Sequence, residues 1–152
     1  MDKEFFLREL EAQSAMLYRV AFTILRNDHA CEDAMQDTAL KAWEKRESLR
    51  EPRYFRTWIT RICINACRDI QRQGKRILAL EDITEPAVSP PDPALNLALA
   101  ALPETLRLPL VLCYSEGMTY AEIATALRLP VPTVRGRIHR AKKELRKELD
   151  AE

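Results

Sequence analysis

Residues 119–145, TYAEIATALRLPVPTVRGRIHRAKKEL, contain two helical patterns separated by a short break. Thr119 and Glu122 form a T-x-x-E capping box, which marks the first turn of a helix. The prolines of RLPVP, residues 128–132, interrupt this pattern, and a second helix is expected from about Thr133. Two helices joined by a break of this kind predict a helix-turn-helix.

The second predicted helix has one apolar and one cationic face. Its apolar residues recur at three- and four-residue steps, which predicts a buried side made of Val134, Ile138, Ala141 and Leu145. The opposite side carries Gly136, His139, Arg140 and Lys143, with Thr133 and Arg135 at its flanks. A small residue permits close approach to a major groove, where arginine can bind guanine edges or phosphates. This face therefore predicts DNA binding.

Upstream of this motif the chain changes character twice. Ala94 to Leu102 is expected to form a short apolar helix, and Pro103 is expected to open another that ends before Gly117. Residues 77–93 lack helical periodicity and combine four prolines with acidic residues, which predicts an extended linker. The linker separates the helix-turn-helix half from the N-terminal half.

The N-terminal half is predicted to contain three helices. The first spans Lys3–Arg26, the second follows a cap at Asp28 and runs to about Lys45, and the third begins at Phe55 after a loop from Glu47 to Arg53. The expected fold class is all-α, with two small helical domains at residues 1–76 and 94–152 joined by the linker at 77–93.

The second predicted helix of the N-terminal half places a large apolar side chain on a polar face. On a helical wheel this face gathers Asp33, Gln36, Asp37 and Leu40. A single exposed leucine is common and often has no role, but one at the centre of a polar face favours a protein partner.

The third predicted helix and the residues just before it are rich in cations and aromatic rings. These residues are Arg53, Tyr54, Arg56, Trp58, Arg61, Arg68, Arg72, Lys75 and Arg76. Cations that follow a backbone beside rings that stack on bases suit single-stranded nucleic acid. The alternative places Phe55 and Trp58 in the core, and we expect Trp58 to be largely packed and Tyr54 to be the more available ring.

The charges are segregated along the chain although the net charge is only +1. Residues 52–76 carry 7 basic and 1 acidic side chains, and residues 128–152 carry 8 and 4, whereas residues 77–127 carry 1 and 7. A polyanion would bind both basic segments and be repelled by the acidic one. Basic helices are often only solvated, so charge alone does not decide between these interpretations.

Several classes of site find no support in the sequence. Cys31, Cys63, Cys67 and Cys113 are expected to act as small hydrophobic residues, and with two histidines no metal-binding pair is formed. We therefore expect no metal, no cofactor and no catalytic residue. No apolar stretch is long enough to span a membrane and the first residues are charged, which predicts a cytoplasmic protein.

Taken together, the two halves resemble the extracytoplasmic-function (ECF) subfamily of the sigma-70 family of bacterial RNA polymerase sigma factors. CEDAMQDTALKAW (31–43) resembles the core-binding helix of sigma region 2, and YFRTWITRICINACRDIQRQGKR (54–76) resembles its promoter-melting helix. Residues 102–145 resemble sigma region 4. The resemblance implies a non-catalytic subunit that binds core RNA polymerase and directs transcription initiation at specific promoters.

The resemblance also implies roles for individual residues. The residues implied to dock on the clamp helices of the beta-prime subunit are Asp33, Gln36, Asp37 and Leu40. Those implied to open and hold the minus-ten element are Arg53, Tyr54, Arg56, Trp58, Arg61, Asn65 and Arg72. Those implied to contact the minus-thirty-five element are Pro130, Thr133, Arg135, Gly136, His139 and Arg140, with Lys143 adding a phosphate contact. Gly136 departs from the commoner serine, and the further implied partners are the beta flap and a cognate anti-sigma factor.

Two other hypotheses remain open at the level of sequence. One is a two-domain transcription regulator whose N-terminal half senses or dimerises and whose C-terminal half binds an operator. A sensing half would need a pocket, whereas this one carries a basic aromatic helix. The other is an enzyme acting on nucleic acid, for which the sequence offers no metal-binding carboxylate cluster and no nucleophile and base pair.

Overall fold

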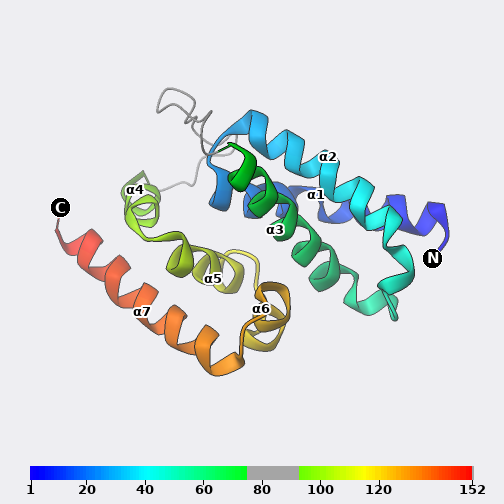
Figure 1. Cartoon of the computed structure of the whole chain (residues 1–152). Coiled ribbons are helices and arrows are strands. Elements are labelled where there is room, and N and C mark those ends of the chain that lie inside the picture. The colour runs from blue at the N-terminus through cyan, green and yellow to red at the C-terminus, as the bar shows by residue number, and fades with distance from the viewer. Residues whose placement is uncertain (75–92, 152) are drawn as a thin grey trace. The chain divides into compact units, whose positions relative to one another are not determined.

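The computed structural model describes residues 1–74 and 93–151, and every regular element in these two ranges is a helix (Figure 1). The predicted all-α fold is confirmed. The chain divides into two compact units, one holding residues 1–74 and the other residues 93–151, and each is described by itself. None of the helices in the described ranges combines the length and apolar character that a membrane span requires.

The predicted linker falls almost entirely outside the described residues. The exception is Pro93, the last residue of the predicted linker, which is the first residue of helix α4. Proline is well suited to a first helical position because its missing N–H has no partner there in any case.

Three long helices form the first unit: α1 (Lys3–Leu25), α2 (Asp28–Glu44) and α3 (Phe55–Gly74). Asp2 caps α1 by accepting a hydrogen bond from the backbone N–H of Phe5 at 2.8 Å. The prediction that Asp28 caps α2 is wrong, because the side chain of Asn27 accepts the bond from Ala30 N at 2.9 Å. Asp28 instead accepts a hydrogen bond from the Tyr18 hydroxyl.

Each of these three helices packs against the other two, as the ribbon in Figure 1 shows. Leu17, Val20 and Ile59 are fully buried, as are the thiols of Cys31 and Cys63. The cysteines of this unit are free and buried, which confirms their role as small hydrophobic residues. Burial raises the pKa of the Cys31 thiol to about 12.

The segment between α2 and α3 is more regular than the predicted loop at 47–53. It contains two short 3-10 helices, η1 (Arg46–Ser48) and η2 (Pro52–Tyr54). The guanidinium of Arg46 lies 4.0 Å from the centre of the Trp43 ring and donates a hydrogen bond to the Trp43 carbonyl. These contacts hold the segment against the end of α2.

Four helices form the second unit: α4 (Pro93–Ala101), α5 (Glu104–Tyr114), α6 (Tyr120–Leu127) and α7 (Val131–Asp150). Helix α7 packs against the other three. It begins two residues before the expected Thr133, because Pro130 is its N-cap and Pro132 fits in its first turn. Pro103 is likewise the N-cap of α5 rather than its first helical residue.

The turns of the second unit are set by local contacts. Thr119 and Glu122 form the predicted capping box, with the Thr119 Oγ1 accepting from Glu122 N at 3.1 Å and the Glu122 carboxylate accepting from Thr119 N at 2.9 Å. Gly117 has a φ of 67°, which glycine adopts without steric cost. The buried Arg107 donates a hydrogen bond to the Leu102 carbonyl at 2.7 Å and so ties the end of α4 to α5.

Candidate functional site

The predicted minus-thirty-five surface lies on helix α7. Its apolar side is buried as expected except at Leu145, which is half-buried because it lines an open groove. Val134, Ile138 and Ala141 are buried against the rest of the unit. The residues exposed on this helix and its N-cap include Pro130, Arg135, Gly136, His139, Arg140 and Lys143, while Thr133 is half-buried. Because the buried side fixes the rotation of the helix, the cationic side chains face solvent together.

Gly136 sits at an open position on this cationic surface. A Cβ atom added there would meet no atom within 4 Å. Packing therefore does not require a glycine here. Because Gly136 has no side chain, the helix backbone is accessible between its cationic neighbours. The Arg135 guanidinium lies 5.9 Å from the centre of the Tyr120 ring, so α6 borders this surface.

The predicted polymerase-binding residues lie together on helix α2. Leu40 is 65% exposed, which is high for a leucine on a helix with a buried side. Asp33 and Gln36 are exposed and Asp37 is half-buried. The apolar side chain is thus presented to solvent beside two carboxylates, as the helical wheel predicted.

The predicted minus-ten residues lie on η2 and α3, and their exposure differs. Tyr54 is 52% exposed, with the Arg53 guanidinium 4.8 Å from the centre of its ring. Trp58 is half-buried against Phe55, with ring centres 5.5 Å apart. Tyr54 is therefore the more available ring, as expected. Of the remaining residues, Asn65 and Arg72 are exposed, whereas Arg56 and Arg61 are half-buried.

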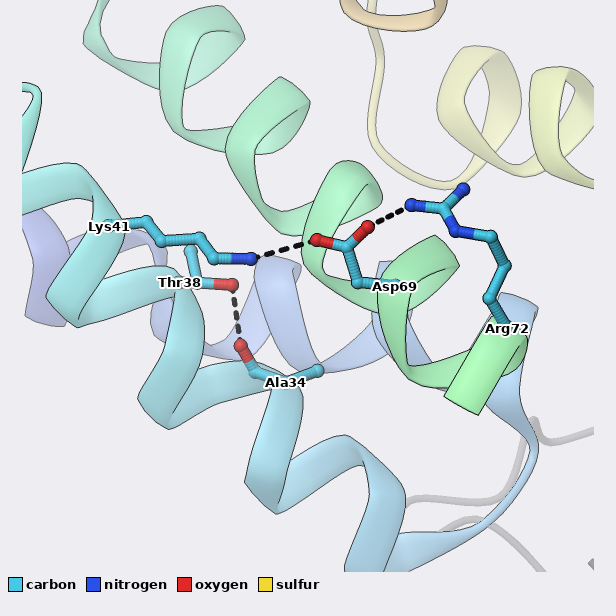
Figure 2. A network of polar contacts seen from close by, with 5 residues as sticks. All are labelled: Ala34, Thr38, Lys41, Asp69 and Arg72. Atoms are coloured by element: carbon cyan, nitrogen blue, oxygen red, sulfur yellow. Dashed lines mark hydrogen bonds and ion pairs between the residues drawn. The ribbon is translucent and has the colours of Figure 1, made fainter. Parts of the chain in front are cut away.

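One of these cations, Arg72, forms an ion pair with the carboxylate of Asp69 on the same helix. Figure 2 shows Asp69 between Lys41 of α2 and Arg72 of α3. Lys41 Nζ donates to Asp69 Oδ2 at 3.0 Å, and the Arg72 guanidinium donates to Asp69 Oδ1. The hydrogen bond from Lys41, together with the two positive charges, holds the pKa of Asp69 below its usual value. The sequence assigned Arg72 to DNA without indicating this pairing.

An apolar groove in the second unit was not predicted. It encloses about 360 Å³ between α4, α5 and α7 and is lined by Leu95, Leu99, Leu110, Val111, Tyr114, Ser115, Lys142 and Leu145. Lys142 Nζ lies 4.8 Å from the centre of the Tyr114 ring, and contact with the Tyr114 side chain holds the pKa of Lys142 above its usual value. The i, i+4 spacing of Leu95 and Leu99 was the available signal in the sequence.

Within residues 1–74 and 93–151, no three or more histidine, cysteine, aspartate or glutamate side chains are grouped so that they could hold a metal ion. The surfaces described above are built from cations, exposed rings and exposed apolar side chains. Such groups bind polyanions, bases and apolar helices.

Family models match most of the chain. The model described as Sigma-70 region 2 matches residues 10–77, and the model described as Sigma-70, region 4 matches residues 93–145. The first match holds α2 and α3, which carry Leu40 and Asn65, and the second holds the helix-turn-helix.

Curated relatives match most of the chain. The chain is 35% identical over 153 residues to the ECF RNA polymerase sigma factor SigE of Mycolicibacterium smegmatis, covering 91% of this chain and 59% of that relative. It is 29% identical over 169 residues to SigW of Bacillus subtilis, covering 97% and 90%. It is 31% identical over 139 residues to the RNA polymerase sigma-H factor of Pseudomonas aeruginosa, covering 78% and 72%.

Two solved structures share the fold. CnrH, in complex with the cytosolic domain of CnrY, has a TM-score of 0.75 at 27% identity, covering 99% of this chain and 91% of its own. The sigma factor RpoE of Bartonella quintana, in complex with the anti-sigma factor NepR, has a TM-score of 0.77 at 23% identity, covering 95% and 96%. With both regions matched in order and relatives of this kind over the same residues, the chain belongs to the extracytoplasmic-function group of the sigma-70 family of RNA polymerase sigma factors.

Proposed function

We propose that this protein binds core RNA polymerase and directs it to start transcription at specific promoters, with no catalytic role of its own. Helix α2 docks on the clamp helices of the beta-prime subunit, η2 and α3 open and hold the minus-ten element, and α7 binds the minus-thirty-five element. The chain spans 59% of the mycobacterial relative and 90% of the Bacillus one, and it contains both matched regions.

The observation that carries this proposal is the exposure of Leu40. Leu40 is 65% exposed and lies beside Asp37 and Asp33. A partner that covers this leucine lowers the free energy of association, because apolar surface is removed from water. DNA cannot be that partner, since the two carboxylates repel phosphates. A protein that carries apolar and basic side chains fits the face, and the clamp helices are the partner that the family membership suggests.

The α7 surface supports binding to duplex DNA. Arg135, His139, Arg140 and Lys143 are exposed on it, and the low surface at Gly136 allows a close approach. Arginine supplies specificity when it donates two hydrogen bonds to a guanine edge, whereas the lysine adds a phosphate contact without sequence preference.

The η2 and α3 surface supports binding to an opened strand. Unstacking a base costs a few kcal/mol, and an exposed ring together with edge contacts can offset that cost. Tyr54 is the exposed ring of this surface, and Asn65 is an exposed amide on it. We assign Tyr54 to stacking and Asn65 to hydrogen bonding with a base of the non-template strand.

The groove of the second unit supports a further contact with polymerase. Its lining is apolar apart from Ser115 and Lys142, so it suits an apolar helix tip that ends in an acidic residue near Lys142. We assign it to the beta flap, because this partner completes a two-point attachment of the chain to polymerase. In that case Leu99→Asp lowers the affinity of the chain for core polymerase. The control is Thr105→Asp, which should leave this affinity unchanged because Thr105 is exposed on α5 and does not line the groove.

The remaining parts of the proposal concern regulation and location. The Bartonella structure contains a sigma factor bound to an anti-sigma factor, and we propose that a cognate anti-sigma factor also binds this chain. We further propose that the protein acts in the cytoplasm, where core polymerase and promoter DNA are found. The alternative of a sensing regulator is not favoured, because the N-terminal half matches sigma region 2.

In vitro transcription tests the proposed function directly. Purified chain is added to core RNA polymerase on a library of genomic fragments, and the starts of the transcripts are mapped. The expected result is a set of starts that share two spaced elements and vanish without the chain. Failure of the chain to associate with core polymerase at any salt concentration, or footprinting of duplex DNA by the chain alone at the same elements, would contradict the proposal.

A further inference from the structure

Asp69 is the one acidic side chain in residues 52–76, a segment that carries 7 basic side chains. It lies on α3 among the residues that are assigned to the minus-ten element. Both of its oxygens are engaged: Oδ2 accepts a hydrogen bond from Lys41 Nζ at 3.0 Å, and Oδ1 accepts one from the Arg72 guanidinium (Figure 2). A carboxylate on a surface that binds DNA repels phosphates, so its presence there needs a reason.

We propose that Asp69 is a specificity-determining residue that holds Arg72 away from phosphates and so lowers the affinity of the chain for DNA of unrelated sequence. The inference rests on the proposed function, because it requires α3 to face DNA. Asp69 then contributes to discrimination between promoter and non-promoter DNA through its ion pair with Arg72.

The physical basis is the origin of nonspecific affinity. Sequence-independent binding comes almost entirely from cations that replace the counterions of DNA phosphates. The Arg72 side chain is 70% exposed and would be free to reach a phosphate, but in this pairing its charge is balanced by Asp69. Binding a phosphate therefore requires breaking the pair and leaving the carboxylate near the DNA, which removes most of the gain.

Lys41 makes this arrangement persistent. It comes from another helix, 28 residues away in sequence, and its side chain is 35% exposed, so it has less freedom than a fully solvated lysine. By holding Oδ2 it fixes the carboxylate with Oδ1 toward Arg72. An i, i+3 pair on a helix surface would otherwise be weak and transient.

The consequence is a difference between two kinds of DNA. At a promoter, base contacts and stacking hold the strand in place, and a phosphate that is held beside Arg72 at high effective concentration can displace Asp69 from it. On unrelated DNA the phosphate contacts supply essentially all of the binding free energy, so the loss of one contact lowers the affinity by its full contribution. Asp69 thus lowers nonspecific affinity more than specific affinity.

The test compares the full chain carrying Asp69→Asn with the full chain carrying Glu11→Gln, an equal change in net charge at an exposed position of α1. Affinity for a duplex of unrelated sequence is measured by fluorescence anisotropy over a range of salt concentrations. Asp69→Asn is expected to raise this affinity by a factor of about 3 to 10 and to steepen the salt dependence by about 0.9 in the log–log slope, equivalent to one added phosphate contact. Glu11→Gln is expected to change it less than about twofold.

Dependence on Arg72 separates this role from a general charge effect. In a chain that also carries Arg72→Ala, Asp69→Asn should no longer exceed Glu11→Gln. Lys41→Gln is the folding control, since it breaks the same bridge between α2 and α3 and is expected to lower the melting temperature. Because Asp69 remains beside Arg72 in this variant, Lys41→Gln should raise the affinity for unrelated DNA less than Asp69→Asn does. If Asp69→Asn does not fold, Arg72→Ala alone decides. A loss of nonspecific affinity below about threefold supports the inference, and any larger loss overturns it.

Equal affinities of Asp69→Asn and Glu11→Gln would overturn the inference, and so would an increase that persists without Arg72. Neither result touches the proposed function, which is tested separately by promoter-specific transcription with the wild-type chain. If the wild-type holoenzyme starts transcription at defined sites while Asp69→Asn binds unrelated DNA no more tightly than Glu11→Gln does, the proposed function is supported and the proposed role of Asp69 is wrong.

Discussion

The indole N–H of Trp58 donates a hydrogen bond to the hydroxyl of Ser48 at 2.9 Å, and that hydroxyl donates to the Lys45 carbonyl at 2.7 Å. Ser48 ends η1 and Trp58 lies in the first turn of α3, so the pair ties the segment between α2 and α3 to the start of α3. This segment leads directly into Tyr54. The Ser48 hydroxyl therefore helps to fix the segment that carries the exposed Tyr54.

Ser48→Ala is expected to lower the free energy of unfolding by about 0.5–1.5 kcal/mol, because the Trp58 indole loses its acceptor. Urea unfolding followed by tryptophan fluorescence measures the change, and the two tryptophans of the chain, Trp43 and Trp58, both lie in the first unit. Ser48→Thr keeps the hydroxyl and should restore most of the loss. Ser14→Ala, which removes a helix-surface hydroxyl on α1, is the control and should leave stability nearly unchanged.

Leu40→Asp is expected to abolish assembly with core polymerase while the chain still folds. The side chain is 65% exposed, so a carboxylate there is solvated in the free protein but would be buried without a partner in the complex. Gel filtration with core polymerase measures assembly, and circular dichroism checks the fold. The matched control is Leu7→Asp at another exposed leucine of the same unit, which is 51% exposed and should assemble normally.

Arg140→Ala is expected to lower discrimination between promoter and altered minus-thirty-five sequences by about 1 to 3 kcal/mol without affecting polymerase binding. Arg140 is exposed on the cationic face of α7, so its loss should not disturb packing. Competition between promoter duplexes for the reconstituted holoenzyme measures the effect. Arg146→Ala removes an exposed cation of the same helix that belongs neither to the predicted DNA contacts nor to the groove lining, and promoter discrimination should survive it.

Thr119→Ala is expected to destabilise the helix-turn-helix by about 1 kcal/mol, because the backbone N–H of Glu122 loses its capping partner. The change should lower the melting transition of the second unit seen by circular dichroism. Tryptophan fluorescence reports on the first unit and should not move. Thr125→Ala, inside α6, removes a hydroxyl that donates to the Ala121 carbonyl and should cost much less; an equal loss in both variants would contradict the capping role.

The stabilisation that Asp69 contributes is expected to disappear at acid pH. Its folded pKa lies below the usual value, so the unfolded chain takes up the proton first as the pH falls. The stabilisation is therefore complete above the unfolded pKa of about 3.9 and is lost as the pH falls through the lower folded pKa. Because Asp69 is 39% exposed, solvent screening limits the effect to about 1 kcal/mol or less. The stability difference between wild type and Asp69→Asn, measured by urea unfolding, should shrink below about pH 4.

Local patterns predicted most elements of the fold and the composition of two surfaces. The capping box at Thr119 is correct because it involves atoms three residues apart, and the exposure of Leu40 follows from a helix whose other side is apolar. The cap of α2 was misassigned to Asp28, since Asn27 and Asp28 both have suitable side chains and the choice depends on how α1 ends, at Arg26 in the left-handed region with a φ of 53°.

The amino-acid sequence by itself determined the helices, their buried sides and the family, because helical periodicity and capping depend on residues within one or two turns of each other. Only the tertiary structure decided that Asp69 meets Lys41, that Ser48 holds Trp58 and that three helices enclose a groove beside Tyr114. Those contacts join separate elements, and their geometry depends on how the helices pack. A pattern read along one helix does not contain that information.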